Sequence, residues 1–126
     1  MNRPARLLVV EDNETNLMIF RDLLTAAGHE VLEAINSGEA LSIAHLEHPD
    51  LILMDIHLSG MDGLEVVRCL KKDPSTSSIP IVALTAHALP AHRQMALEAG
   101  CSGYITKPIR SKEFRDQVKA YLEKGP

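Results

Sequence analysis

Residues 50–55 read Asp-Leu-Ile-Leu-Met-Asp, and this short stretch decides the fold class. Four apolar residues between two acids are typical of a β-strand covered on both faces, as in a parallel sheet. Similar runs predict three more strands, at Leu7–Val10, Ile79–Leu84 (interrupted by Pro80) and Tyr104–Ile105. Glu30–Ala34, which mixes apolar residues with acids, predicts a weaker fifth strand.

Helix-length segments with 3.6-residue apolar spacing separate these strands. The first has an apolar stripe from Leu17 to Ala27 and a stop at Gly28, and Ser37 is the predicted N-cap of the second, which ends before Pro49. The other three are predicted from Leu64 to Lys71, from Pro90 to Ala99, and from Ser111 to Leu122. Strict alternation of strands and helices predicts an α/β fold with a doubly wound, five-stranded parallel sheet. For this length the flavodoxin-like order 2-1-3-4-5 with five helices fits best.

Composition limits the classes of function. A chain of 126 residues fits one domain, 1–126, and its net charge of −4 disfavours nucleic-acid binding. No apolar run approaches the length of a membrane span, and no leader-like segment precedes Leu7, so we expect no membrane association. Two cysteines do not form a disulfide framework and indicate reduced thiols in a cytoplasmic protein.

Polar side chains follow the predicted strands where ligands bind in doubly wound sheets, outside the carboxyl ends. These residues are Glu11 and Asp12, Asp55, Thr85 and Lys107. Crowded carboxylates repel one another, and a hard divalent cation such as Mg²⁺ removes that cost. A carboxylate nucleophile, a metal site, an ammonium and a hydroxyl are together the parts needed to move a phosphoryl group onto an aspartate. Each acid alone would more often be a helix cap, but the combination at successive strand ends favours chemistry.

The combined motifs resemble the receiver domain of two-component response regulators. They are Val10-Glu11-Asp12, Asp50–Asp55 with Gly60–Gly63, Ile79–Ala86, and Gly103–Pro108. The resemblance extends from Leu7 to Leu122. Blocks at 40–44, 49–56 and 63–66 are most similar to a receiver that acts alone, without an output domain, in cell-cycle control.

This resemblance implies a role for each site residue. Asp55 would be the phospho-acceptor, and Asp12, Asp55 and the backbone carbonyl of His57 would bind Mg²⁺, with Mn²⁺ as a substitute. Glu11 would complete the acidic pocket through water. Thr85 and Lys107 would contact the phosphoryl group. The remaining implied roles are Tyr104 as the switch aromatic, Lys107-Pro108 as a cis peptide, and His57 with His87 as modulators of phosphate lifetime.

The implied function is a stand-alone receiver in a phosphorelay. A sensor histidine kinase or histidine phosphotransfer protein would phosphorylate Asp55, and the surface from Pro90 to Leu122 would then regulate a downstream signalling protein. Such a protein is not an enzyme beyond its own phosphorylation and dephosphorylation, and we expect a monomer or weak dimer. Two alternatives fit less well. A haloacid-dehalogenase-type phosphatase needs a general-acid Asp where His57 stands, and a flavodoxin-like electron carrier needs aromatic residues to stack on a flavin.

The other histidines and the sulfur-containing side chains have simpler interpretations. His29, His45, His48 and His92 lack the spacing of metal ligands and are expected at the surface. Cys69 and Cys101 are expected to pack as small apolar groups.

Overall fold

The computed structural model describes residues 4–56, 63–86 and 90–124, which form five strands and five helices in strict alternation. The elements are β1 (Arg6–Val10), α1 (Glu14–Ala26), β2 (Glu30–Ala34), α2 (Ser37–Glu47), β3 (Leu51–Asp55), α3 (Gly63–Lys72), β4 (Ile81–Thr85), α4 (Pro90–Ala99), β5 (Gly103–Thr106) and α5 (Ser111–Lys124). No helix among the described residues has the length and apolar character needed to cross a bilayer.

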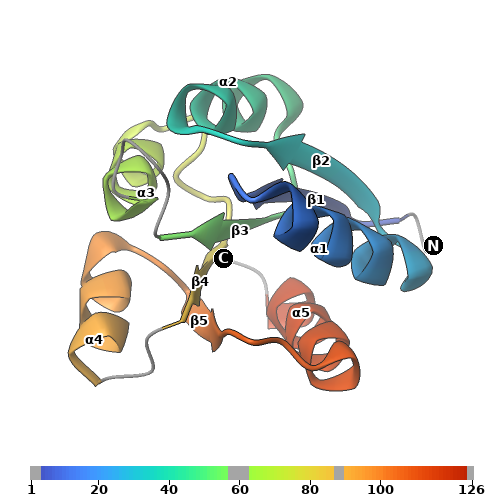
Figure 1. The fold of residues 1–126 in the computed structure, drawn as a ribbon. Helices are drawn as coiled ribbons and strands as arrows, with labels where there is room; N and C mark the ends of the chain where they lie inside the picture. Colours follow the sequence, from blue (N-terminus) through green and yellow to red (C-terminus); the bar gives the residue numbers. More distant parts are fainter. Residues whose placement is uncertain (1–3, 57–62, 87–89, 125–126) are drawn as a thin grey trace.

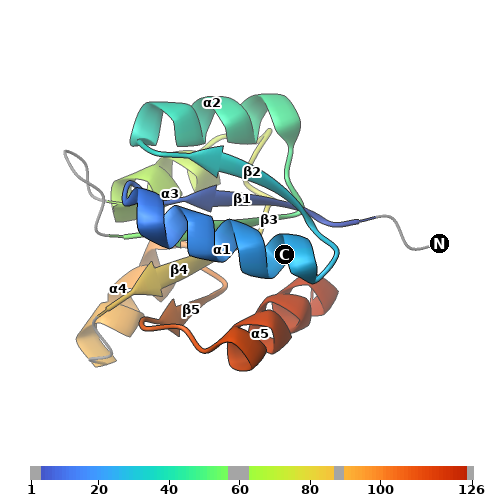
Figure 2. The ribbon, with the colours of Figure 1, turned by 45° about the vertical axis from the view of Figure 1, so that its right-hand side comes forward.

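The sheet has the predicted order, β2-β1-β3-β4-β5, and all its pairings are parallel. Helices cover both faces (Figure 1). Figure 2 shows α1 and α5 on one face, with α2, α3 and α4 on the other. The doubly wound fold is therefore confirmed.

Side-chain alternation along the strands divides the interior into two apolar layers. In β1, Leu8 and Val10 point into the layer under α2, α3 and α4, whereas Leu7 and Val9 point into the layer under α1 and α5. The second layer contains an aromatic pair, Phe20 of α1 and Phe114 of α5, with ring centroids 5.4 Å apart. Because both faces of β3 are covered, an uninterrupted apolar run is the pattern its burial requires.

Several element ends differ from the sequence predictions. Asn36, not Ser37, caps α2, because its side chain accepts a hydrogen bond from the Glu39 backbone N–H at 2.8 Å. Asn13 caps α1 in the same way. The fourth strand begins at Ile81 rather than Ile79. Each asparagine side chain accepts a hydrogen bond from a backbone N–H of the first helical turn, which has no acceptor within the helix.

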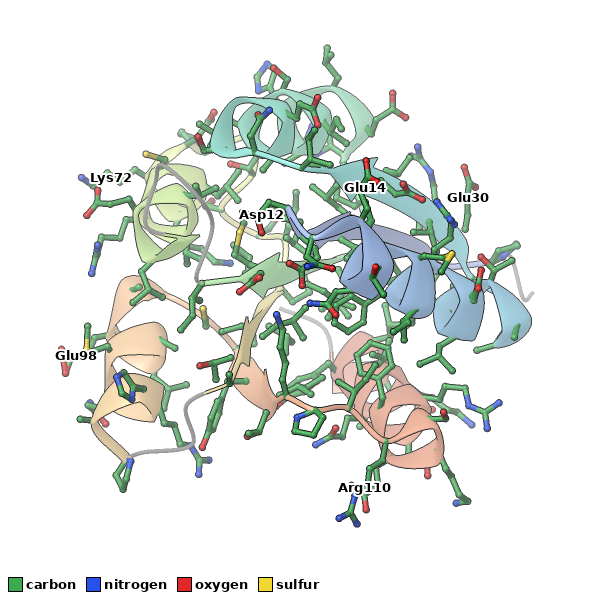
Figure 3. All side chains as sticks on the ribbon, viewed as in Figure 1. Asp12, Glu14, Glu30, Lys72, Glu98 and Arg110 are labelled. Atoms are coloured by element: carbon green, nitrogen blue, oxygen red, sulfur yellow. The ribbon has the colours of Figure 1, made fainter. Side chains whose placement is uncertain are left out.

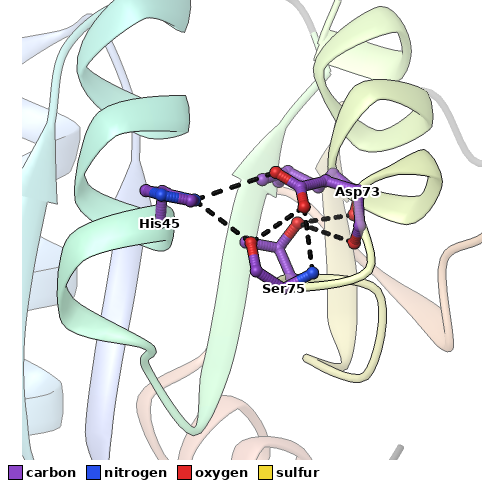
Figure 4. A network of polar contacts seen from close by, with 5 residues as sticks. His45, Asp73 and Ser75 are labelled. Atoms are coloured by element: carbon purple, nitrogen blue, oxygen red, sulfur yellow. Dashed lines mark hydrogen bonds and ion pairs between the residues drawn. The ribbon is translucent and has the colours of Figure 1, made fainter.

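A polar network holds the segment between α3 and β4 (Figure 4). The Asp73 carboxylate accepts hydrogen bonds from the backbone N–H and the hydroxyl of Ser75, at 2.9 and 2.8 Å. Nδ1 of His45 on α2 lies 3.1 Å from that hydroxyl, so the network joins α2 to the segment that follows α3. The buried Thr76 hydroxyl donates to the Leu70 carbonyl at 2.6 Å and so holds this segment against the end of α3.

Cys69 departs from its prediction. Cys101 is buried, as expected, but Cys69 lies on the exposed side of α3. The reason is helical phase: Val66, Val67 and Leu70 take the buried positions of α3 and leave Cys69 facing outward.

Candidate functional site

The carboxyl ends of the strands bring the predicted site residues together at one edge of the sheet. Glu11 and Asp12 directly follow β1, Asp55 ends β3, Thr85 ends β4, and Lys107 follows β5. Parallel pairing of these strands sets their ends side by side, and Figure 3 shows Asp12 at this edge. The site thus depends on strand register rather than on a sequence-local motif.

Three carboxylates form an acidic cluster. One oxygen from each of Glu11, Asp12 and Asp55 lies within 4.8 Å of the others. Glu11 and Asp55 are buried, and Asp12 is half-buried at the mouth of the cluster. A compact set of oxygen donors, one of them open to solvent, suits a hard divalent cation that keeps part of its water shell.

Lys107 provides the positive charge nearest to this cluster among the described residues. Its Nζ donates to Glu11 Oε1 at 3.0 Å and to Asp55 Oδ2 at 3.1 Å. Burial works to lower the pKa of Lys107, but the hydrogen bond to Glu11 and the charges of Asp55 and Glu11 outweigh it, and the pKa is raised. The ammonium therefore stays charged and neutralises part of the cluster.

The pKa of Glu11 is shifted in the direction opposite to that of an ordinary ion-paired acid. Burial raises the pKa of Glu11, and the adjacent Asp55 carboxyl raises it further, against the lowering effect of Lys107. The ionised form of Glu11 is thus disfavoured, although Lys107 lies 3.0 Å from its carboxylate. An added cation would favour the ionised carboxylates and relieve this crowding.

Backbone contacts fix the two ends of the site. The Glu11 N–H donates to the Ala34 carbonyl at 3.0 Å, and the Lys107 N–H donates to the Thr85 carbonyl at 2.7 Å. The Lys107–Pro108 peptide bond is cis. These contacts connect β1 to the end of β2, and the segment after β5 to the end of β4.

Gly63, the first residue of α3, makes a close approach that the sequence analysis missed. A Cβ at this position would lie 2.5 Å from the Asp55 carbonyl oxygen and 2.6 Å from Ile56 Cα. The Gly63 N–H also donates to the Ile56 carbonyl at 3.3 Å. The absence of a side chain therefore lets α3 pack directly on the backbone that carries the Asp55 carboxylate.

Thr85 and Tyr104 connect the cluster to the surface of α4. Thr85 is buried at the end of β4, and Tyr104 on β5 is half-buried, two register positions from Thr85. The Arg93 guanidinium of α4 lies over the Tyr104 ring, 5.4 Å from its centroid, a cation–π geometry. Arg93 was not predicted, because residues of α4 and β5 meet only in the fold.

Two predicted residues, His57 and His87, lie outside the described residues. Among the other histidines, His45 and His48 are exposed as expected, whereas His29 and His92 are half-buried. Burial lowers the pKa of His29.

An acidic cluster with a paired lysine, set at the carboxyl edge of a 2-1-3-4-5 sheet, defines a receiver domain. The chain belongs to the response regulator receiver domain family, which it matches over residues 7–119. It is 44% identical over 119 residues to the polar-differentiation response regulator DivK of Brucella anthropi, an alignment that covers 94% of this chain and 97% of that protein.

Solved structures agree with this assignment. The receiver domain of a sensor histidine kinase from Pseudomonas aeruginosa, whose structure has a magnesium ion in the active-site cleft, is 30% identical with a TM-score of 0.88 and covers 96% of this chain and 99% of its own. The chemotaxis protein CheY4 of Vibrio cholerae is 26% identical with a TM-score of 0.89, and the match covers 94% of this chain and 98% of its own. The chain is thus a DivK-like response regulator receiver.

Proposed function

We propose that this receiver accepts a phosphoryl group on Asp55 from a phosphohistidine of a sensor kinase or phosphotransfer protein. The observation that carries the proposal is the contact of one Asp55 oxygen with Lys107, while Glu11 and Asp12 lie around it. Asp55 is buried at the carboxyl end of β3, so a donor would approach it from that edge of the sheet. Transfer to a carboxylate requires stabilisation of the charge on the phosphoryl oxygens, and these neighbours can supply it.

Mg²⁺ is the cofactor that this donor set fits best. Asp12, Asp55 and the backbone carbonyl of His57 would hold it, with Glu11 joined through water and Mn²⁺ as a substitute. The metal would supply neutralisation of charge on the phosphoryl oxygens. Magnesium in the related kinase receiver supports this assignment.

Lys107 and Thr85 would bind the phosphoryl oxygens. In the present arrangement the Lys107 ammonium is shared between Glu11 and Asp55, and it can follow the new negative charge by rotation of its own side chain. Thr85, buried beside Lys107 and joined to it through the backbone, offers a hydroxyl donor. Both groups are neutral or cationic donors, as a phosphoryl group requires.

The donor protein would dock beside the site on an apolar surface. A pocket of about 510 Å³ is lined by Lys107 together with Ile19, Phe20, Pro108 and Ile109. Since Lys107 also lines the acidic cluster, a partner that covers this pocket would present its histidine close to Asp55. Covering apolar surface at the mouth would also exclude water from the transfer.

Phosphorylation would be reported by movement of Thr85 and Tyr104. If Thr85 turns towards the phosphoryl group, Tyr104 can reorient only by leaving its contact with Arg93. A pocket of about 660 Å³ between α4, β5 and α5 includes both Arg93 and Tyr104, so this movement would reshape it for a downstream signalling protein. A bias of about 1–3 kcal/mol is enough for such a switch.

We extend the proposal to the remaining properties of the chain. Residues 1–126 act as one receiver in the cytoplasm, as a monomer or weak dimer, in a relay of the cell-cycle type suggested by DivK. It catalyses only its own phosphorylation and dephosphorylation, and the side chains at His57 and His87 tune the phosphate lifetime. Decay of the phosphorylated protein between pH 6 and 8, in wild type and in a His57→Gly, His87→Ala variant, tests that tuning.

Intact-mass measurement after incubation with acetyl phosphate and Mg²⁺ tests the central proposal. We expect one added phosphoryl group in the wild type and in Asp22→Asn, a control on the exposed side of α1, but none in Asp55→Asn or in excess EDTA. Labelling of Asp55→Asn to the wild-type level would refute the assignment. For the switch, Tyr104→Ala should be phosphorylated normally but lose the affinity gain for a partner.

A further inference from the structure

The amino edge of the sheet, opposite the acidic cluster, has a groove of about 800 Å³ between α5 and the turn from α1 to β2. We call it the basal groove. Its residues are Pro4, Ala5, Ala27, Gly28, His29, Lys112, Arg115, Asp116 and Lys119. One wall is formed by Pro4 and Ala5, just before β1, and by the α1–β2 turn, which contribute small, uncharged side chains beside His29. The other wall is one face of α5, so the two walls differ sharply in charge.

The α5 wall carries most of the charge. Lys112, Arg115 and Lys119 repeat at three- and four-residue spacing, which places them on one side of the helix. With Asp116 they give the groove a fixed charge of +2, whereas the whole chain carries −4. The basal groove is therefore positive on a protein that is otherwise acidic.

Two of these cations lack an acidic partner within the described parts of the chain. Lys112 pairs with Asp116 at 3.2 Å. Arg115 donates only to the Ser111 carbonyl, at 3.4 Å, and Lys119 forms no ion pair in the described ranges. Among the described residues that line the groove, Asp116 is the only carboxylate. The charge of Arg115 and Lys119 is thus left for a ligand from outside.

The spacing of Arg115 and Lys119 along the groove matches that of side chains in an extended peptide. Four residues of α-helix rise about 6 Å, so Arg115 and Lys119 project about that far apart along the groove. Alternate side chains of an extended chain lie on the same side, about 6.6 Å apart. An acidic-x-acidic segment therefore matches the two cations, while the small side chains of the opposite wall leave room for its backbone.

We propose that the basal groove binds an extended acidic segment of a partner protein, separately from the phosphorylation site. Charge complementarity favours this occupant over a nucleic acid, because specific nucleic-acid binding uses several phosphate contacts and the chain as a whole is negative. Charge complementarity also favours an acidic segment over a second copy of the chain, because the two positive basal grooves of a symmetric pair would repel each other. A partner held here leaves the surface of α4 and β5 open.

Fluorescence polarisation with a labelled peptide of alternating Glu and Ser tests the proposal. We expect saturable binding by the wild type and at least tenfold weaker binding by the Arg115→Gln, Lys119→Gln variant. The control is Arg68→Gln, Lys72→Gln on α3, which loses the same charge from a different helix and should bind within about twofold of wild type. Circular dichroism and Asp55 labelling by acetyl phosphate should be unchanged in both variants.

Each other result overturns the proposal. Equal losses in the two double variants would mean general attraction to positive charge, and equal binding of a Gln-Ser peptide would mean that carboxylates are not recognised. Tighter binding of oligothymidylate than of the acidic peptide would identify the groove as a nucleic-acid surface. A concentration-dependent dimer abolished by the Arg115→Gln, Lys119→Gln change would assign it to a second copy. Because Asp55 labelling is measured in parallel, failure here is distinguishable from failure of the proposed function.

Discussion

Gly63→Ala tests whether α3 holds the backbone of Asp55 in place. The added Cβ would lie 2.5 Å from the Asp55 carbonyl oxygen, whereas ordinary contact begins at 3.4 Å, so the start of α3 must retreat by about 0.9 Å. Neither contact atom can yield easily, because both belong to the backbone at the end of β3, between β1 and β4. Overpacking of this kind costs about 1–3 kcal/mol, and we expect the upper half of that range.

The same displacement should slow chemistry at Asp55. A shift of about 1 Å in a reacting group can cost about a hundredfold in rate, so we expect phosphorylation by acetyl phosphate to slow by at least tenfold. Urea denaturation measures the stability, and the initial rate of mass gain measures the chemistry. The control is Gly38→Ala on α2, where the nearest atom, Asn36 Oδ1, is 3.5 Å from the new Cβ. It should be as stable as wild type or more stable by up to about 1 kcal/mol, and equally reactive.

A Gly63→Ala protein with the stability and phosphorylation rate of wild type would refute this reasoning. Loss of stability without loss of rate would show that α3 supports the fold but not the position of Asp55. The two measurements therefore separate packing from positioning.

Three further predictions concern other buried groups. Glu11→Gln should stabilise the metal-free protein at pH 7, because the raised pKa of Glu11 favours its neutral form, and this gain in stability should shrink towards pH 4, where Glu11 itself is protonated. Its Mg²⁺ affinity should fall at least about tenfold. Urea denaturation midpoints measure the first effect and a metal titration measures the second. Burial raises the pKa of Cys101 to about 12, so at pH 8 a thiol reagent should modify the exposed Cys69 rapidly and Cys101 only on unfolding; fast reaction of both would contradict its burial. Thr76→Val should cost about 1–2 kcal/mol in urea denaturation, because it leaves the Leu70 carbonyl without its buried donor, whereas a cost near zero would mean that water replaces the hydroxyl.

The strands and the polar residues that follow them could be predicted from the sequence, because both are local patterns. An apolar run that ends in Asp55 predicts both a buried strand and a polar residue at its carboxyl end. In a parallel sheet the carboxyl ends of different strands lie at the same edge, so these polar residues come together there. Helix caps were predicted less well, since Asn36 and Ser37 are both good caps and only the backbone geometry decides between them. The contact of Gly63 with Asp55 and that of Arg93 with Tyr104 are tertiary, and no spacing in one sequence reveals them.

The hydrogen bond from Lys107 to Glu11 joins residues 96 positions apart in the chain. During synthesis, β1 and its acids leave the ribosome long before β5 and the lysine that follows it. A nascent chain therefore has an aspartate at position 55 but no ammonium beside it, and its acids meet only when the last strand pairs with β4. On the proposed function, competence to accept a phosphoryl group would thus depend on completion of folding, and unfinished chains would not compete with mature ones for a phosphoryl donor.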